Sequence, residues 1–376
     1  METARRPNIE DVAQRAGVSR AAVSKVIRDA YGVSDEMRAK VEAAISDLGY
    51  RPRVSARGMR GSTYTLGVAL PSIANPFFTK LITGAAQELE GTRYQLIIAP
   101  AGLPYDGGPH AIEILADRQV DGILAVSPNA VPEWLEEVGR HTPLLMLGRH
   151  DDSSNYDTIV NDDVMGARIA VQHLYELGHR DIAHLTIPLK SDAHLRLIPH
   201  HVRAGGYEKA MAELGLADRT RLVASASNQE EGRLRALELL TGDRPPTAIF
   251  AGHDELGLGV LQAVSELGLT PGQVSVIGYD DTDIAAHPLV SLTSINQSGT
   301  YMGGLFVRLI LERIAGRTEP AHEVIQPKVM ARRTTAPLEP RPGAARTGLL
   351  SRGLLRWPGG SSASARQMST GRATAE

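Results

Sequence analysis

The sequence predicts a small N-terminal all-α domain followed by a larger α/β domain with parallel sheets and two lobes. The first fifty residues carry three short helical patterns of apolar residues. From Tyr64 onward, short apolar runs alternate with helical segments, which is typical of parallel sheets covered on both faces. These runs fall into two sets, before and after about residue 160, and so indicate two lobes of similar topology.

The length and composition limit the class of protein. A chain of 376 residues is too long for one ordinary core. Its 42% hydrophobic and 22% charged residues are those of a globular protein. The absence of cysteine excludes disulfides, thiolate metal sites and cysteine nucleophiles. No apolar run is long enough to span a bilayer, and the N-terminus lacks the apolar core of a secretory signal, so we expect a cytoplasmic protein.

The first predicted helix starts after Asn8, a residue type that caps helix starts. Its apolar stripe consists of Ile9, Val12, Ala13 and Ala16. Gly17 then allows a tight turn, and Ser19 caps the next helix. A small residue, a glycine four positions later and a capped helix directly afterwards form the spacing of a helix-turn-helix.

The second helix lies in the stretch GVSRAAVSKVI and has two different faces. The apolar face consists of Ala22, Val23, Val26 and Ile27. The opposite face consists of Arg20, Ala21, Ser24, Lys25 and Arg28. In a helix-turn-helix this second face enters the DNA major groove. Arg20 and Lys25 can donate to guanine O6 and N7, whereas Ser24 and the helix N-terminus suit phosphate. The alternative is a solvated amphipathic helix in a small bundle.

A third helix and a basic stretch complete the N-terminal region. The helix starts at Ser34, carries Asp35 and Glu36 where they complement the helix dipole, and stops at Gly49. Its inward positions are Val41, Ala44, Ile45 and Leu48. Residues 51–60, RPRVSARGMR, contain four arginines and no acidic residue, which favours a polyanionic partner at this end of the chain. Alone in water this stretch forms at best a marginal helix, and the alternative is a flexible basic linker.

The body contains strand-length apolar runs separated by helical patterns. The predicted strands are 65–70, 94–99, 122–127, 143–147, 181–186, 247–252 and 273–279. The predicted helices are about 76–90, 109–118, 132–140, 162–177, 202–214, 229–241, 254–267 and 299–315. In open parallel sheets a ligand binds beyond the carboxyl ends of the strands. The polar residues just past those ends include Ser72, Ser127, Arg149, His253, Asp254 and Asp280. This set fits a hydroxyl-rich or ionic small molecule between the lobes.

Residues 8–52 resemble the DNA-binding headpiece of the LacI/GalR family without a gap, from NIEDVAQRAGVSRAAVSKVI to VSDEMRAKVEAAISDLGYRP. The resemblance continues through NPFF, VDGIL, LGHRDIAHL, VSVIGYDD and LTSINQ, and it covers about residues 8–335. It implies a periplasmic-binding-protein-like effector domain in which closure of two lobes on a ligand is transmitted to a hinge. The implied domains are a helix-turn-helix headpiece (1–50), a hinge helix or linker (51–63) and an effector-binding and dimerisation domain (64–335). The remaining residues, 336–376, are rich in Pro, Gly, Ser and Arg, and this composition predicts a disordered tail.

The resemblance also implies roles for individual residues. Arg20, Ala21 and Lys25 stand at base-reading positions, although arginine is usual at the place of Lys25. Ser19, Ser24 and Arg28 join them on the DNA-facing side. The hinge folds on operator DNA and wedges an apolar side chain into the minor groove. Its implied DNA contacts are Arg53, Ala56, Arg57 and Met59, with Met59 as the wedge.

In the effector domain the resemblance implies that Phe77 and Phe78 form an apolar wall, Arg203 binds ligand hydroxyls or a carboxylate, and Asp280 accepts ligand hydrogen bonds. The full predicted effector set is Ser72, Phe77, Phe78, Ser127, Arg149, Arg203, His253, Asp254, Asp280 and Gln297. Three alternatives stay open. The phenylalanines can pack the helix start, Arg149 can bridge the lobes, and Gln297 can bond backbone. For His194, His200 and His201 a polar loop is favoured over a metal site, because their spacing matches no ligand pattern.

These features together predict a cytoplasmic, nucleoid-associated transcription regulator of the repressor type. We expect it to bind a near-palindromic operator as a homodimer and to respond to a sugar or sugar derivative, with no cofactor and no metal. The C-terminal residues contain no apolar heptad that would make a tetramer. An α/β enzyme is the first alternative, but the chain has no P-loop, G-x-S-x-G or H-E-x-x-H motif. The second is a transport-type sugar-binding protein, which the N-terminal helices oppose.

Overall fold

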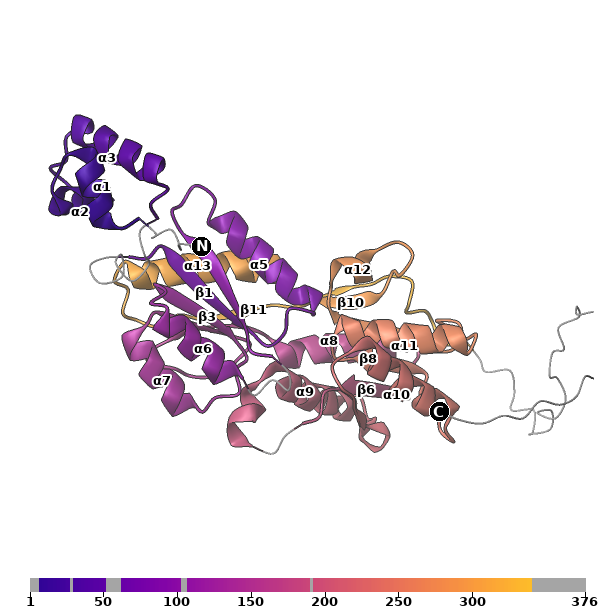
Figure 1. Cartoon of the computed structure of the whole chain (residues 1–376). Helices are drawn as coiled ribbons and strands as arrows, with labels where there is room; N and C mark the ends of the chain where they lie inside the picture. Colours follow the sequence, from indigo (N-terminus) through magenta and orange to yellow (C-terminus); the bar gives the residue numbers. More distant parts are fainter. Residues whose placement is uncertain (1–6, 28–29, 52–61, 103–106, 190–191, 340–376) are drawn as a thin grey trace, which may run out of the picture. The chain divides into compact units, whose positions relative to one another are not determined.

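The computed structural model of the chain describes residues 7–27, 30–51, 62–102, 107–189 and 192–339 (Figure 1). Several predicted DNA contacts lie outside the described residues, namely Arg28, Arg53, Ala56, Arg57 and Met59. The predicted tail beyond residue 339 also lies outside them. Within the described ranges, no helix is both long and apolar enough to cross a membrane.

The N-terminal domain contains the three predicted helices, α1 (Ile9–Ala16), α2 (Arg20–Ile27) and α3 (Asp35–Leu48). Asn8 and Asp11 cap α1 reciprocally, because each side chain accepts a hydrogen bond from the other residue's backbone N–H, at 3.0 and 2.7 Å. Gly17 has a left-handed backbone with φ of 67°, and the Val18 N–H donates to the Ala13 carbonyl at 3.0 Å. The helices enclose a small core of Val12, Ala13, Val23, Val26, Val41 and Ala44.

Lobe 1 is built around a sheet whose described strands follow the order β11-β5-β4-β3-β1-β2, with every neighbouring pair parallel. These strands are β1 (Thr65–Leu70), β2 (Gln95–Pro100), β3 (Gly122–Val126), β4 (Leu144–Leu147), β5 (Asp157–Asn161) and β11 (His322–Ile325). The helices are α5 (Pro76–Glu88), α6 (Gly108–Asp117), α7 (Pro132–His141) and α13 (Gly299–Ile314). Every residue of β3 and β4 is buried, as expected for a parallel sheet covered on both faces.

Lobe 2 repeats this plan with a sheet in the order β12-β10-β9-β8-β6-β7, in which the edge strand β12 is antiparallel. The strands are β6 (Ile182–Thr186), β7 (Arg221–Ala224), β8 (Ala248–Ala251), β9 (Ser275–Asp280), β10 (Thr293–Asn296) and β12 (Lys328–Met330). The helices are α8 (Asp163–Glu176), α9 (Pro199–Glu213), α10 (Gln229–Thr241), α11 (Asp254–Glu266) and α12 (Asp283–Ala286), with short 3₁₀ turns η1 (Ala193–Leu197) and η2 (Ala217–Arg219). Helices α8 and α9 pack together, as do α10 and α11 (Figure 1).

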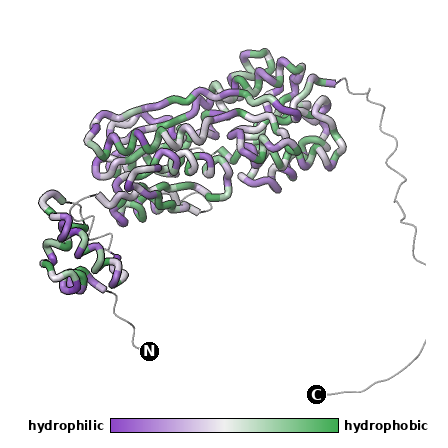
Figure 2. Tube along the Cα trace, turned by 90° about the horizontal axis from the view of Figure 1, so that it is seen from above, coloured by the Kyte–Doolittle hydropathy of each residue, from purple (hydrophilic) through white to green (hydrophobic). Residues whose placement is uncertain are grey.

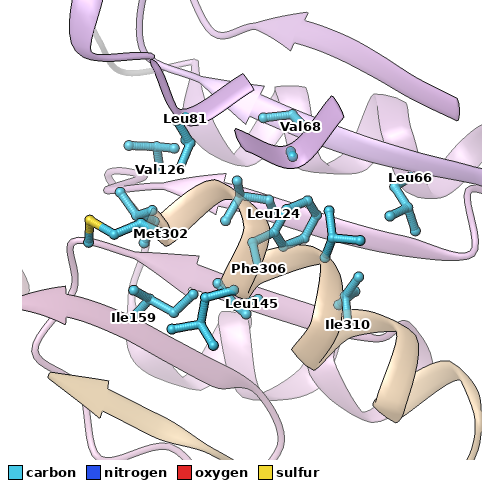
Figure 3. Close-up of a cluster of buried hydrophobic side chains, with 14 of the residues drawn as sticks. Leu66, Val68, Leu81, Leu124, Val126, Leu145, Ile159, Met302, Phe306 and Ile310 are labelled. Carbon is cyan, nitrogen blue, oxygen red and sulfur yellow. The ribbon is translucent and has the colours of Figure 1, made fainter. Parts of the chain in front are cut away.

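The prediction that the chain divides into lobes once, near residue 160, is wrong. After building lobe 2, the chain returns to lobe 1 with α13 and β11, and then crosses back to lobe 2 with β12. Helix α13 packs along α5, and the two approach so closely that a Cβ on Gly84 would lie 1.8 Å from the Thr300 carbonyl oxygen. Figure 3 shows Met302, Phe306 and Ile310 of α13 among the buried side chains of the lobe 1 core.

The predicted C-terminal boundary of the effector domain, residue 335, also lies too early in the chain. Residues 336–339, assigned to the tail, bond to lobe 2 through the N–H groups of Ala336, Leu338 and Glu339. Along the body, hydrophobic and hydrophilic residues alternate over short stretches of chain, as expected for helices with one buried face (Figure 2). Short strands such as β5, β7 and β10 through β12 were not among the predicted ones, because their runs are only three to five residues long.

Candidate functional site

The predicted DNA-facing side of α2 lies opposite the side that packs into the N-terminal core. Val23 and Val26 are buried, whereas Arg20, Ala21 and Lys25 are exposed. Arg20 contacts a surface carboxylate of Glu10 at 3.4 Å, and both side chains remain more than 60% exposed. Such an exposed pair contributes little to stability and leaves the guanidinium available to another acceptor.

The start of α2 is fixed by Ser19, whose Oγ accepts the N–H of Ala22 at 3.1 Å. Ser19 is exposed and Ser24 is half-buried. A capped helix start with exposed hydroxyl and cationic side chains provides donors for phosphate at the N-terminus and for base edges along the first two turns. The surface is therefore chemically suited to DNA.

Residues with a strained backbone lie at the carboxyl ends of several strands in the body. Ser127, Asp280, Asp281 and Ser298 all have positive φ, at 41°, 113°, 51° and 59°. Residues other than glycine adopt this region at an energetic cost, and such positions cluster at functional sites. Ser127 follows β3 of lobe 1. In lobe 2, Asp280 ends β9, Asp281 follows it, and Ser298 lies just after β10. The strained edge coincides with the region predicted to hold the effector.

Asp280 and Gln297 are in direct contact. The Gln297 Nε2 donates to Asp280 Oδ1, and its Oε1 accepts from the Nδ2 of Asn161 at 2.9 Å. Asn161 ends β5 of lobe 1, while Gln297 lies on the connection from β10 to α13. Two of the segments that join the lobes are thus tied to one buried carboxyl group. Burial, followed by the nearby charge of Asp254, holds the pKa of Asp280 well above its usual value.

Arg203 is the centre of a second buried group. It is 2% exposed and donates from Nη2 to Asp163 Oδ1 at 2.7 Å, and from Nη1 to the Gly252 carbonyl. Its guanidinium lies over the Tyr279 ring at 3.4 Å from the centroid, and the Tyr279 hydroxyl also donates to Asp163 at 3.2 Å. From lobe 1, His150 Nε2 contacts the other carboxylate oxygen of Asp163 at 3.1 Å.

His253 lies next to this group at the start of α11. Its Nδ1 accepts the Leu256 N–H at 3.4 Å, so its Nε2 carries the proton and donates to Ser227 Oγ at 2.9 Å. Burial, reinforced by the cation of Arg203, lowers the pKa of His253 to about 3. The same causes lower the pKa of His184 in β6 to about 3, despite its bond to the carbonyl of Phe250 in β8, on whose ring it is stacked. Both imidazoles are neutral at physiological pH.

These depressed values predict acid destabilisation. The unfolded chain takes up a proton on each histidine below about pH 6.5, whereas the folded chain does so only near pH 3. The stability from neutral His184 and His253 is therefore complete above pH 6.5 and is lost as the pH falls, by about 2 kcal/mol each at pH 5. Asp254, whose burial raises its pKa to about 6, opposes this trend in part.

The measurement is urea unfolding at pH 7.5 and pH 5 for the natural chain and His184→Gln. We expect a smaller loss of stability between the two pH values in the variant. His110→Gln is the matched control, because the His110 side chain is 76% exposed. An equal loss in the natural chain and His184→Gln would contradict the assignment of the acid sensitivity to His184.

Three predicted effector residues have internal roles instead. Arg149 is fully buried and donates to Asp151 at 2.6 and 3.2 Å and to two lobe 1 carbonyls, so it does not bridge the lobes. Phe77 belongs to the lobe 1 core at 6% exposure. Asp254 accepts hydrogen bonds from Thr282 and Ser294 at 2.6 to 2.8 Å. The contacts of each of these three side chains lie within its own lobe.

The other predicted residues of lobe 1 remain nearer the surface. Ser72 and Phe78 are half-buried, and Ser72 Oγ accepts the Ala74 N–H at 3.0 Å. Ser127 Oγ donates toward the Leu147 and Gly148 carbonyls at 3.3 and 3.2 Å. The nearby Asn75 caps α5 and also bonds to Asp280, so the start of α5 faces lobe 2. Ser72 and Phe78 flank that point in the sequence.

Two cavities of the described body lie away from these residues. One of about 710 Å³ is lined by β7 and α10, including Arg221, Arg235 and Arg244. The other, of about 200 Å³, lies between α8 and α9. The predicted effector side chains do not line either cavity. Among the described residues, no cluster of three or more histidines and carboxylates could hold a metal ion, and His194 instead contacts Asn129 at 2.9 Å.

Sequence reasoning missed several members of the site. Asp163 pairs with Arg203, Asn161 and Asn75 surround Asp280 and Gln297, and Ser227 fixes His253. Asp163 looks like an ordinary acidic residue in the first turn of a helix. The paired acids in NDD, directly after a buried strand, were the one available signal. The contacts themselves join positions that are far apart in sequence.

A helix-turn-helix domain followed by a two-lobed body with a buried polar site at its strand ends defines a DNA-binding regulator with a small-molecule-sensing domain. Two family models match the chain: bacterial regulatory proteins, lacI family, over residues 8–53, and periplasmic binding protein-like domain over residues 171–335. The HTH-type transcriptional repressor PurR of Vibrio campbellii is 32% identical over 336 residues, which make up 88% of this chain and 99% of that repressor. The chain belongs to the lacI family of bacterial regulatory proteins.

Solved structures agree with this assignment. The lac repressor dimer bound to operator and the anti-inducer ONPF has a TM-score of 0.74 at 26% identity, over 88% of this chain and 100% of that one. The transcriptional regulator CelR in complex with cellobiose has a TM-score of 0.62 at 30% identity, also over 88% of this chain and 100% of that one. The similarity therefore spans both the N-terminal domain and the body.

Proposed function

We propose that this protein is a homodimeric transcriptional repressor of the bacterial cytoplasm, that it binds a near-palindromic operator, and that a neutral carbohydrate controls it. The observation that carries the proposal is the exposed face of α2, with Arg20, Ala21 and Lys25 on a capped helix whose other face is fixed in a core. The similar lac repressor is known as a dimer bound to operator, and the similar regulator CelR as a complex with cellobiose. No enzymatic step is part of the proposal.

The proposed effector site lies at the strand ends of the two lobes. Arg203, His253, Asp280 and Gln297 supply polar groups from lobe 2 and its connections. From lobe 1, Ser72 and Ser127 supply hydroxyls and Phe78 supplies an apolar wall. The charge of Arg203 is already matched by Asp163, and His253 is neutral. Burial raises the pKa of both Asp280 and Asp254, which means that negative charge is costly here, so a further buried negative charge is disfavoured. These features favour an uncharged, hydroxyl-rich ligand.

Signal transfer would follow contacts that tie the lobes to the start of the body. Asn161 and Gln297 lie on two of the segments between the lobes, and Lys80 of α5 pairs with Asp283 of lobe 2 at 3.1 Å. At the entry to lobe 1, Asp121 accepts the N–H groups of Thr63 and Tyr64, each at 2.7 Å. A change in lobe closure would therefore act on the segment that leads back to the hinge, with a coupling of about 1–3 kcal/mol.

The test is selection of bound duplexes from random DNA by the purified full-length chain, followed by anisotropy titration of the enriched duplex. We expect a near-palindromic sequence to emerge and its affinity to fall steeply with salt, because phosphate contacts release counterions. Failure to enrich any sequence at low salt, with or without added sugars, would contradict the proposed function. Removal of residues 1–60 serves as the negative control for DNA binding.

A further inference from the structure

We infer that His200 and Thr186 are specificity-determining residues, each of which binds a hydroxyl of a neutral sugar. The inference rests on the proposed function and deepens it by naming a recognition point that sequence reasoning did not include. Both side chains lie in lobe 2, with Thr186 at the carboxyl end of β6 and His200 in the first turn of α9. His200 lies on the same helix as Arg203, and Thr186 ends a strand of the sheet in lobe 2.

The main observation is a pair of buried polar atoms without partners. Thr186 is 2% exposed, and its Oγ1 has no hydrogen-bond partner among the described residues. The Nδ1 of His200 is likewise buried and unpartnered within that part of the chain. Buried polar groups are nearly always hydrogen-bonded in folded proteins, and leaving one unsatisfied costs about 1–3 kcal/mol. These two atoms, one at the carboxyl end of β6 and one in the first turn of α9, indicate a ligand as the missing partner.

Their surroundings place both atoms in the same region. Thr186 Oγ1 lies 3.5 Å from where a Cβ on Gly252 would stand, and the Gly252 carbonyl accepts from Arg203. The ring of His200 meets that of the adjacent His253 edge to face, with centroids 6.0 Å apart. Across the lobes, a Cβ on Gly148 would lie 3.0 Å from Pro199, which precedes His200. Thr186 therefore lies beside Gly252, whose carbonyl binds Arg203, His200 lies beside His253, and the start of α9 lies against Gly148 of lobe 1.

The chemistry of the pair fits hydroxyl groups. Burial and the nearby cation of Arg203 hold the pKa of His200 well below its usual value, so its imidazole is neutral. A neutral imidazole nitrogen and a threonine hydroxyl can each bond a ligand hydroxyl, which both donates and accepts. The two residues favour uncharged hydroxyls over a group that must itself bring a charge.

The experiment uses the full-length chain with D-ribose, D-glucose and cellobiose as probes. Thermal-shift measurements identify the sugar that raises the unfolding midpoint most, and calorimetry gives its affinity for each variant. We expect His200→Leu and Thr186→Val each to weaken the binding of that sugar by about tenfold or more, because each substitution leaves a ligand hydroxyl unpaired. His200→Asn, which keeps a polar atom near the position of Nδ1, should recover part of the loss. Thr83→Val is the control, because the Thr83 hydroxyl bonds within α5.

The outcomes separate this inference from the proposed function. Unchanged affinity in both His200→Leu and Thr186→Val would overturn it, and so would tighter binding of glucose 6-phosphate than of glucose. If the natural chain selects an operator but none of the three sugars shifts its midpoint, the inference fails and the DNA-binding function stands. If no operator is selected, the proposed function itself fails.

Discussion

Replacing Asp163 with alanine is expected to destabilise lobe 2 by about 3–5 kcal/mol, because the change leaves the Arg203 guanidinium buried without its carboxylate. Asp163 also accepts from the Tyr279 hydroxyl and contacts His150, so the same substitution removes a link between the lobes. Urea unfolding at pH 7.5, followed by circular dichroism, measures the effect. The expected result is a lower midpoint of the transition.

The matched control is Asp181→Ala. Asp181 also pairs with an arginine, Arg219 at 3.4 Å, but both side chains are about half exposed. Exposed pairs contribute about 0–1 kcal/mol, so this variant should unfold close to the natural chain. The double variant Asp163→Ala with Arg203→Leu should recover part of the loss, because it removes the unpaired charge as well. If Asp163→Ala unfolds like Asp181→Ala, the charge of Arg203 is compensated by another group, and the proposed central role of Asp163 is wrong.

The sequence predicts the strand ends well, because the change from buried to exposed positions produces a clear change from apolar to polar residues. An apolar run followed by a polar residue marks the end of a buried parallel strand, and Asp280 and His253 were found in this way. Arg203 lies on a helix and was found through the family resemblance alone. All three lie in the two buried groups at the strand ends of lobe 2. The pattern could not show which of these side chains bond to one another.

Arg149 illustrates why some site predictions gave the wrong role. The position of an arginine directly after a buried strand predicts a ligand contact. In the structure, however, the Arg149 guanidinium donates to Asp151, two residues later, and lies inside lobe 1. Periodicity gives the side of an element and does not give the rotamer of a long side chain. Phe77 shows the same limit, since both a ligand wall and a core contact require an apolar residue at the start of α5.

The return of α13 to lobe 1 is a limit of another kind. Its apolar residues predict a buried helix, but nothing local determines which sheet it covers. The choice depends on close contacts with α5, where a Cβ on Gly303 would lie 2.0 Å from the Leu81 carbonyl oxygen. Such shape complementarity joins positions more than two hundred residues apart. A single sequence therefore predicts the helix but does not predict which other helix packs against it.

Replacing Arg20 with alanine is expected to weaken binding to the selected operator by about 5- to 150-fold, since a good bidentate contact to guanine contributes about 1–3 kcal/mol. Arg20 is exposed on α2 and makes only a surface contact with Glu10 at 3.4 Å, so the fold should be unaffected. The measurement is anisotropy titration of the natural chain and the variant on the selected duplex and on a scrambled duplex of equal length. A base contact predicts loss on the selected duplex with little change on the scrambled one.

Arg15→Ala provides the matched control within the same domain. Arg15 is also an exposed arginine, but it lies on α1 and pairs with Asp47 of α3 at 2.9 Å. Because it is outside the exposed face of α2, we expect its removal to leave the preference for the selected duplex intact. Equal losses on both duplexes for Arg20→Ala would mean that Arg20 binds phosphate, because phosphate contacts carry no direct sequence information. In that case Ala21 and Lys25, the other predicted base-reading positions, would have to read the operator without it.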